Sequence, residues 1–200
     1  MTEGAGRVRR GKTPIHDAAI RLFKSRGYHG TSMRDIAREA GINVASIYHH
    51  FGSKQEILQE VMVRMMTDVI SVTRAAVLAA DPEPDKQLAA LVHAWVLFHA
   101  DHQQEAMIGG SELRSLDDDG RQRVVALRDE QQRLFDEVIA RGVDQRTFHT
   151  AHPKEASRAV INMGHAVASW YSSDGEIPPE HMAQRYVELA LATVGCMKQE

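Results

Sequence analysis

Apolar side chains recur every three to four residues along most of this 200-residue sequence, a spacing that gathers them on one face of an α-helix. No stretch makes a convincing strand. Gly109 and Gly110 predict a kink or a break inside the sixth helix, which is the weakest of the set. The pattern predicts an all-α protein of about nine helices, with approximate bounds 13–26, 32–40, 44–51, 54–80, 85–102, 103–115, 121–141, 153–171 and 178–197.

The second, third and fourth predicted helices carry clear start and stop signals. Ser32, followed three residues later by Asp35, is close to a capping box. Gly41 ends that helix, and Asn43 caps the next one. The segment SKQE at 53–56 is a full capping box that opens a much longer helix. Two short helices joined by a tight turn that contains a glycine are typical of a helix-turn-helix.

The second short helix, residues 44–51, has the composition of a DNA-reading element. Ile47 and Phe51 form its apolar underside. Its other positions hold small or hydrogen-bonding residues where a buried helix would have leucine. Such a helix can enter the major groove, where base edges offer donors, acceptors and thymine methyl groups. The alternative is a packed three-helix unit with an ordinary polar surface.

Four sequence segments resemble the DNA-binding domain of TetR/AcrR-family repressors: TSMRDIA at 31–37, AG at 40–41, IYHHF at 47–51 and SKQE at 53–56. The resemblance runs from about residue 15 to residue 61. It implies a dimeric, all-helical regulator whose N-terminal three-helix domain binds a palindromic DNA operator. It further implies a C-terminal domain for small-molecule binding and dimerisation, and we expect domain bounds of 13–60 and 61–200.

The resemblance also assigns DNA-binding roles by position. Tyr48 and His49 would contact the DNA backbone or bases, and Thr31 and Lys54 would hold phosphates. Residues 43–46 would face the groove. The candidate DNA-binding residues are Arg9, Arg10, Thr31, Ser32, Asn43, Val44, Ala45, Ser46, Tyr48, His49 and Lys54.

The net charge of −3 hides a strong asymmetry that favours a nucleic-acid partner. Residues 1–54 carry a net charge of +6, whereas residues 55–200 carry −9, so only one end of the chain attracts phosphate. Residues 1–12 place basic side chains among glycines without a helical period, which predicts a flexible basic arm. Such an arm can enter a minor groove; the alternative is a disordered, solubilising tail.

Several other features limit the function. One cysteine, Cys196, excludes an internal disulfide and suits a reducing compartment. No apolar run is long enough to cross a bilayer, and the N-terminus lacks the apolar core of a signal peptide. We therefore expect a cytoplasmic protein without a membrane partner.

The last two predicted helices, 153–171 and 178–197, are apolar on more than one side. A helix pair of this kind needs a partner as well as its own core. We expect a homodimer in which the two copies of this pair form a four-helix bundle. The alternative is a pair that is fully buried within a monomer.

A ligand pocket should lie among the helices between residues 85 and 171, with an apolar wall and a few polar groups. The C-terminal run from Met163 to Val194 resembles, more faintly, TetR-family regulators of fatty-acid and sterol breakdown that answer to acyl-CoA esters. Ser169, the residue before Trp170, is not basic, although a basic side chain at this position could contact the CoA phosphates. The candidate ligand-binding residues are Trp95, Phe98, His99, Met107, Glu112, Gln131, Leu134, Phe135, Asn162, Met163 and Trp170.

Catalytic and metal chemistry find little support in the sequence. No nucleophile–base order, phosphate-binding glycine loop or carboxylate pair in an apolar setting stands out. His99 and His102, with Glu105 nearby, lack an identifiable third ligand in register. We expect no cofactor, no metal and no enzyme activity. The sequence thus predicts a repressor that leaves DNA when a small apolar effector binds, and an acyl-CoA is one candidate effector. The alternatives are a ligand-independent architectural DNA-binding protein and a small helical carrier or enzyme.

Overall fold

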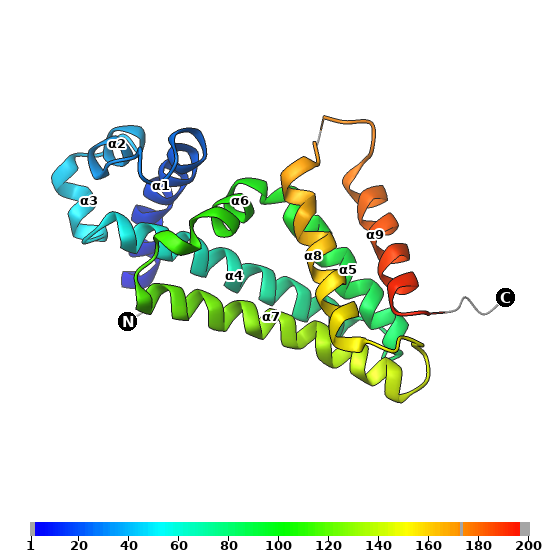
Figure 1. The fold of residues 1–200 in the computed structure, drawn as a ribbon. Helices are drawn as coiled ribbons and strands as arrows, with labels where there is room; N and C mark the ends of the chain where they lie inside the picture. Colours follow the sequence, from blue (N-terminus) through cyan, green and yellow to red (C-terminus); the bar gives the residue numbers. More distant parts are fainter. Residues whose placement is uncertain (1–2, 173, 197–200) are drawn as a thin grey trace. The chain divides into compact units, whose positions relative to one another are not determined.

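The structure, a computed structural model, describes residues 3–172 and 174–196, with side chains from residue 13 onward (Figure 1). Over these residues it contains helices and no strand, which confirms the all-α prediction. None of the described helices is both long and apolar enough to cross a membrane. The elements are α1 (Glu3–Arg26), α2 (Met33–Glu39), α3 (Val44–His50), α4 (Lys54–Ala79), α5 (Pro84–Asp101), α6 (Gln103–Glu112), the 3₁₀ helix η1 (Leu113–Ser115), α7 (Asp118–Asp144), α8 (Pro153–Trp170) and α9 (Pro179–Thr193).

Two helix starts differ from those that the sequence predicts. The backbone of the expected arm is helical from Glu3, so α1 starts well before residue 13 and includes Pro14 in its interior. The residues before Ile15 offer no apolar period, so their helix leaves no hydrophobic signal. α7 begins before the predicted Arg121, because the Asp117 carboxylate accepts the Gly120 amide at 2.8 Å and caps the helix.

The predicted break at Gly109 and Gly110 is wrong, since α6 runs through both glycines. Each glycine costs a helix interior about 1 kcal/mol relative to alanine. Ala106 and Ile108 offset that cost, because their side chains are buried at 1% and 3% exposure. Packing therefore overrides local propensity in this helix.

The chain divides into two compact units. Unit 1 comprises residues 1–65 and 107–125, and unit 2 comprises residues 66–106 and 126–200. The helices α4, α6 and α7 each contribute residues to both units. The expected bounds of 13–60 and 61–200 stay a prediction. By packing, residues 107–125 belong with the first unit, a membership that the sequence did not indicate.

Unit 1 has one hydrophobic core. It joins α1, α2 and α3 to the first turns of α4, with Ile15, Ile36 and Ile47 fully buried. Ile108 and Leu116 from the later segment are part of the same core. The Gln55 side chain donates to the Ser115 carbonyl at 2.6 Å, so η1 is also fixed to α4 by a hydrogen bond within this unit.

Unit 2 is built around α5, which packs against both α8 and α9. Leu88, Leu91 and Val96 of α5 are completely buried. The segment after α7 folds back over the unit: Phe148 is buried against Gly142, where a Cβ atom would overlap its ring. The His149 amide donates to the Val194 carbonyl at 2.9 Å and so ties this segment to the end of α9.

Candidate DNA-binding site and effector core

The capping signals in the helix-turn-helix are formed as the sequence predicts. The Ser32 hydroxyl accepts the Asp35 amide at 3.2 Å, and the Asp35 carboxylate accepts the Ser32 amide at 3.1 Å. Gly41 ends α2 in the left-handed region, at φ 66°. The side-chain oxygen of Asn43 (Oδ1) accepts the Ala45 amide at 2.8 Å and caps the start of α3. Local side chains therefore end α2 and start α3 at the predicted positions.

The capping box at the start of α4 is only half formed. The Ser53 hydroxyl accepts the Glu56 amide at 3.2 Å, as expected. The Glu56 carboxylate, however, accepts the Gly52 amide at 2.9 Å, one residue earlier than a capping box requires. Both bonds still satisfy amide donors at this helix start.

The outer face of α3 carries the predicted base-reading residues together. Ile47 and Phe51 hold the helix in the core, with 0% and 2% of their surface exposed. Tyr48 is 52% exposed and Val44 37% exposed. On the same face Asn43, Ala45 and His49 are exposed, and Ser46 is half-buried.

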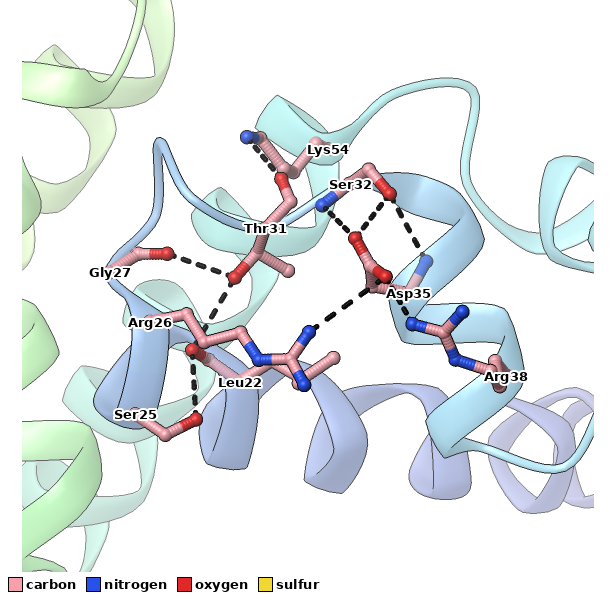
Figure 2. A network of polar contacts seen from close by, with 9 residues as sticks. All are labelled: Leu22, Ser25, Arg26, Gly27, Thr31, Ser32, Asp35, Arg38 and Lys54. Carbon is pink, nitrogen blue, oxygen red and sulfur yellow. Dashed lines mark hydrogen bonds and ion pairs between the residues drawn. The ribbon is translucent and has the colours of Figure 1, made fainter.

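Thr31 and Lys54, predicted to hold phosphates, are engaged inside unit 1 (Figure 2). Thr31 is only 2% exposed, and its hydroxyl donates to the Gly27 carbonyl at 2.9 Å. The Lys54 ammonium donates to the carbonyls of Tyr28 at 2.7 Å and Thr31 at 2.6 Å. Burial lowers the pKa of Lys54. Their direct contact with phosphate stays a prediction.

Ser32, Arg9 and Arg10 complete the predicted DNA-binding set. Ser32 is exposed at the start of α2, where its hydroxyl also lies 2.5 Å from the Asp35 carboxylate. The hydrogen bonds from the Ser32 side chain and backbone lower the pKa of Asp35. The side chains of Arg9 and Arg10 lie outside the described residues.

In unit 2 the structure brings five of the predicted ligand-binding residues into the interior. Trp95, Phe98 and His99 come from α5, and Gln131 and Phe135 come from α7; all five are buried. The rings of Trp95 and Phe135 meet edge to face with centroids 5.7 Å apart, and the Trp95 ring lies 4.1 Å from the His99 ring. The Trp95 indole donates to the Ile161 carbonyl of α8 at 3.0 Å. Contact of these five residues with a ligand stays a prediction, and we call them the effector core.

Two polar side chains of the effector core each have an atom without a partner. His99 is fully buried, and its Nδ1 lies 2.8 Å from the Trp95 carbonyl oxygen, which fixes the proton on Nδ1 and leaves Nε2 as an unpaired acceptor. Gln131 is 1% exposed, its Oε1 lies 3.1 Å from the Thr73 hydroxyl, and its Nε2 has no partner. Burial lowers the pKa of His99 to about 4, so this imidazole is neutral at physiological pH.

The other predicted ligand-binding residues lie elsewhere. Leu134 and Met163 are half-buried, whereas Asn162 and Trp170 are exposed on α8. The Asn162 amide donates to the Arg158 carbonyl of its own helix at 2.7 Å. Met107, which is 49% exposed, and Glu112 belong to unit 1. Sequence spacing did not separate the inward-facing from the outward-facing members of this set.

Sequence reasoning missed two features of these sites. Gly164 of α8 packs directly on the Trp95 side chain, and Tyr28 receives the Lys54 ammonium over its ring at 4.2 Å. The small residues of α8 were a visible signal for the first feature. Nothing in the sequence links Tyr28 to Lys54.

The histidines show no arrangement for a metal. Among the described residues, no group of three or more His, Cys, Asp or Glu side chains could hold an ion. His102 stacks on Phe98, with ring centroids 4.1 Å apart, and its Nδ1 lies 3.0 Å from the Phe98 carbonyl oxygen. These contacts hold the imidazole against the end of α5.

A unit that contains a helix-turn-helix with an exposed polar face on α3, together with an all-helical unit with a buried aromatic core, is typical of helix-turn-helix regulators. The profile of bacterial regulatory proteins of the tetR family matches residues 15–61, and the profile of the tetracyclin repressor-like C-terminal domain matches residues 81–194. The chain therefore belongs to the TetR family of bacterial regulatory proteins.

Individual relatives resemble the chain along most of its length. The transcriptional repressor KstR2 of Mycobacterium tuberculosis is 26% identical over 196 residues, which cover 97% of this chain and 98% of KstR2. A tetR-family regulatory protein from Rhodococcus RHA1 has a TM-score of 0.87 and 30% identity, over 94% of this chain and 98% of that one. AibR, solved in complex with isovaleryl coenzyme A and operator DNA, has a TM-score of 0.80 and 24% identity, over 92% of this chain and 97% of its own.

Proposed function

We propose that this regulator acts in the cytoplasm as a homodimeric repressor on a palindromic operator, and that a small, largely apolar effector releases it. The observation that carries the DNA-binding part is the outer face of α3. Tyr48 is 52% exposed on a helix that Ile47 anchors at 0% exposure, so polar side chains are held outward on a fixed base. Such a face fits a major groove.

Residues 43–46, the N-cap and first turn of α3, are the proposed base-reading positions. Asn43, Val44, Ala45 and Ser46 occupy the N-terminal end of α3, the end from which recognition helices contact base edges. Tyr48 and His49, one turn further on, are proposed to contact the DNA backbone or neighbouring bases. Hydrogen bonds to phosphates fix the register, and contacts to base edges carry the sequence preference.

The proposed dimer forms through the outer sides of α8 and α9. The protomer core leaves several apolar side chains of these helices exposed, and Trp170 at 53% and Leu189 at 51% are the largest. A second copy would cover them in a two-fold interface, in which each patch meets its own equivalent. The exposed apolar residues of this face are Ala159, Ala166, Trp170, Leu189 and Ala192.

The effector core supports binding of an apolar ligand in unit 2. Its aromatic rings supply an apolar wall, and the unpaired Nε2 atoms of His99 and Gln131 offer one acceptor and one donor. Buried polar atoms without partners cost stability, so a ligand that pairs them gains affinity. An acyl-CoA is the proposed candidate because AibR, a relative in fold, was solved with isovaleryl coenzyme A.

Shared helices give the effector a route to the DNA. The helices α4, α6 and α7 belong partly to each unit. A ligand that repacks their residues in unit 2 therefore acts on helices that extend into unit 1. Two recognition helices must lie about 34–36 Å apart to enter successive major grooves. We propose that effector binding changes this separation and lowers operator affinity.

The test is a titration of the repressor bound to DNA from upstream of its own gene. Acyl-CoAs of several chain lengths are compared with the matching free acids. Release by CoA esters alone supports a cationic rim for the CoA head group, for which half-buried Arg128 of α7 is the proposed residue. Equal release by free acids supports an apolar site without that rim. Failure of both ligand series would remove the acyl-CoA proposal.

A further inference from the structure

Two polar side chains of the effector core, which lie on different helices, each have one atom that no described residue pairs with. His99 of α5 is completely buried, and its Nε2 is unpaired. Gln131 of α7 is 1% exposed, and its Nε2 is also unpaired. Buried polar atoms in folded proteins nearly always have a partner, because an unpaired one lowers stability. Two such atoms in one aromatic core mark a candidate subsite for the polar part of a ligand.

The helices that carry these two side chains run in opposite directions. Near the start of α5, Gln87 accepts a hydrogen bond from Arg141, which lies near the end of α7. Further along α5, the ring of Trp95 meets the ring of Phe135, which comes earlier on α7, with centroids 5.7 Å apart. A step forward along α5 therefore corresponds to a step backward along α7.

This arrangement brings His99 and Gln131 to the same level of unit 2. His99 lies one turn after Trp95 on α5, and Gln131 lies one turn before Phe135 on α7. Residues four positions apart share a helix face. In an antiparallel pair the two steps lead in the same direction, so His99 and Gln131 lie on the same side of the Trp95–Phe135 contact.

A neighbour from α8 agrees with this placement. The ring of His165 meets the ring of His99 edge to face, with centroids 5.1 Å apart. Burial and the charge of Arg128 lower the pKa of His165. Arg128 lies one turn before Gln131 on α7, so α7 also approaches the His99 level from this side.

At Nε2, His99 can only accept a hydrogen bond. Its Nδ1 lies 2.8 Å from the Trp95 carbonyl oxygen, which has no hydrogen, so the ring proton is on Nδ1. Burial lowers the pKa of His99 to about 4, so the ring binds no second proton at neutral pH. A ligand atom at Nε2 must therefore bring a hydrogen. A carboxylate, a ketone or a thioester carbonyl brings only lone pairs, which the lone pair of Nε2 repels.

Gln131 has the opposite requirement. Its Oε1 lies 3.1 Å from the hydroxyl of Thr73, which is itself completely buried, and its unpaired Nε2 can only donate. A ligand atom at this end of the amide must be an acceptor. A hydroxyl is both a donor and an acceptor on one neutral oxygen, whereas an ammonium only donates and an ether only accepts.

We propose that the effector carries a hydroxyl group on its apolar body, and that this hydroxyl donates to Nε2 of His99 and accepts from Nε2 of Gln131. The proposal rests on the effector binding proposed above and adds the chemical class of the ligand. That class is an aliphatic or alicyclic alcohol, including a hydroxylated acyl chain. The rings of Trp95 and Phe135 cover its apolar part.

Matched probes separate the hydroxyl from the apolar body. Octanol and methyl heptyl ether have the same number of heavy atoms and one oxygen each. Both oxygens can accept from Gln131, but only octanol can donate to His99. Affinities for the full-length protein without DNA are measured by calorimetry, for this pair and for matched pairs of other chain lengths. We expect the alcohol to bind about tenfold more tightly than the ether. Equal affinities within every pair would overturn the proposal.

His99→Phe should remove the preference for the alcohol while keeping an aromatic ring in the core. The ratio of the alcohol affinity to the ether affinity should fall to about one. A purely structural role of His99 would weaken both probes alike and leave the ratio unchanged. His93→Phe is the control, because His93 lies on the same helix but pairs with Glu180 of α9 at 3.0 Å, and it should keep the preference. A His99→Phe protein that still prefers the alcohol would refute the role of His99.

Gln131→Met should act differently from His99→Phe. Both probes lose the donor that meets their oxygen, so both should bind more weakly by a similar factor, and the preference for the alcohol should remain. Unchanged affinities for both probes in Gln131→Met would remove Gln131 from the subsite.

The hydroxyl subsite and the effector role fail in different ways. Binding without a preference for the alcohol overturns the subsite alone and leaves an apolar effector. If neither probe binds at any chain length, the subsite and the apolar effector site both fall. Alcohol-selective binding that does not release operator DNA supports the subsite and overturns only the effector role.

Discussion

Gly164 of α8 lies so close to Trp95 of α5 that no side chain fits between them. A Cβ atom at position 164 would lie 2.3 Å from Cδ1 of the indole and 2.7 Å from its Nε1. The indole is held in place by its hydrogen bond to the Ile161 carbonyl and by its contact with Phe135. The absence of a side chain at position 164 therefore sets how closely α8 approaches the effector core.

Gly164→Ala should destabilise the protein. The added methyl group must displace a buried indole, and overpacking of this kind costs about 1–3 kcal/mol. Gly109→Ala is the matched control, because a Cβ atom at Gly109 of α6 would meet nothing within 4 Å. Its helix propensity should raise stability by up to about 1 kcal/mol. The free energy of unfolding in urea gives both values, and equal effects of the two changes would contradict this packing argument.

Acidification should destabilise unit 2 through His99. An unfolded histidine titrates near pH 6.5, whereas burial lowers the pKa of His99 to about 4 in the folded chain. Between these values the unfolded chain binds a proton that the folded chain does not. Stability is therefore lost as the pH falls through this window, by about 1.4 kcal/mol per pH unit and about 3 kcal/mol in all.

His99→Gln should flatten that pH dependence, whatever its effect on stability at neutral pH. The measured quantity is the slope of the free energy of unfolding against pH between about 6.5 and 4. His152→Gln is the control, since His152 is exposed on the chain before α8. If His99→Gln leaves the slope of the free energy of unfolding against pH unchanged, another group causes the loss of stability in acid.

Local signals predicted the helix-turn-helix well. Asp35, Gly41 and Asn43 act on neighbours within a few residues, so their spacing in the sequence already determines the bonds that they make. Ile47 and Phe51 were likewise predicted as the buried side of α3 from a spacing of one turn.

Contacts between distant segments could not be predicted in this way. Lys54 meets carbonyls from Tyr28 and Thr31, and Gln55 bonds to Ser115, far along the chain. A period of 3.6 residues tells which side of a helix is apolar, but it does not tell which neighbour covers that side. For this reason Trp170 was expected in the ligand pocket and is 53% exposed instead.

The choice of the proposed dimer face depends on the same difference between a helix side that is apolar and one that no neighbour in the protomer covers. From the sequence, Ala190 and Val194 fall on the apolar side of the predicted helix 178–197, so a charge at either position would be expected to disrupt a dimer. They are 1% and 0% exposed within a single protomer, so a charge at either position would unfold the chain rather than separate two copies. Leu189, 51% exposed on the adjacent position of α9, is the informative site.

Leu189→Glu should give folded monomers. A carboxylate in the centre of an apolar two-fold interface meets its own copy, so both desolvation and repulsion oppose association. Sedimentation velocity reports the mass, and circular dichroism reports the helix content. Ala190→Glu is the comparison and should lose helix content. A Leu189→Glu protein that remains dimeric would place the interface elsewhere.

Tyr48 and Ser46 should affect DNA binding in different ways. Tyr48→Ala removes an exposed side chain with a proposed backbone contact, so it should weaken binding to all duplexes by a similar factor. Substitutions at Ser46, at the proposed base-reading end of α3, should instead change which DNA sequence is preferred, with a free-energy cost of about 1–3 kcal/mol for a mismatched base pair.

If each half of the dimer neutralises about four phosphates, the slope of log K against log salt should be near −7 for the wild-type protein. Binding measured across a salt series, on the operator from upstream of the repressor's own gene and on single-base variants of it, gives both quantities. A salt-independent affinity, or binding that Tyr48→Ala leaves unchanged, would remove α3 as the recognition helix.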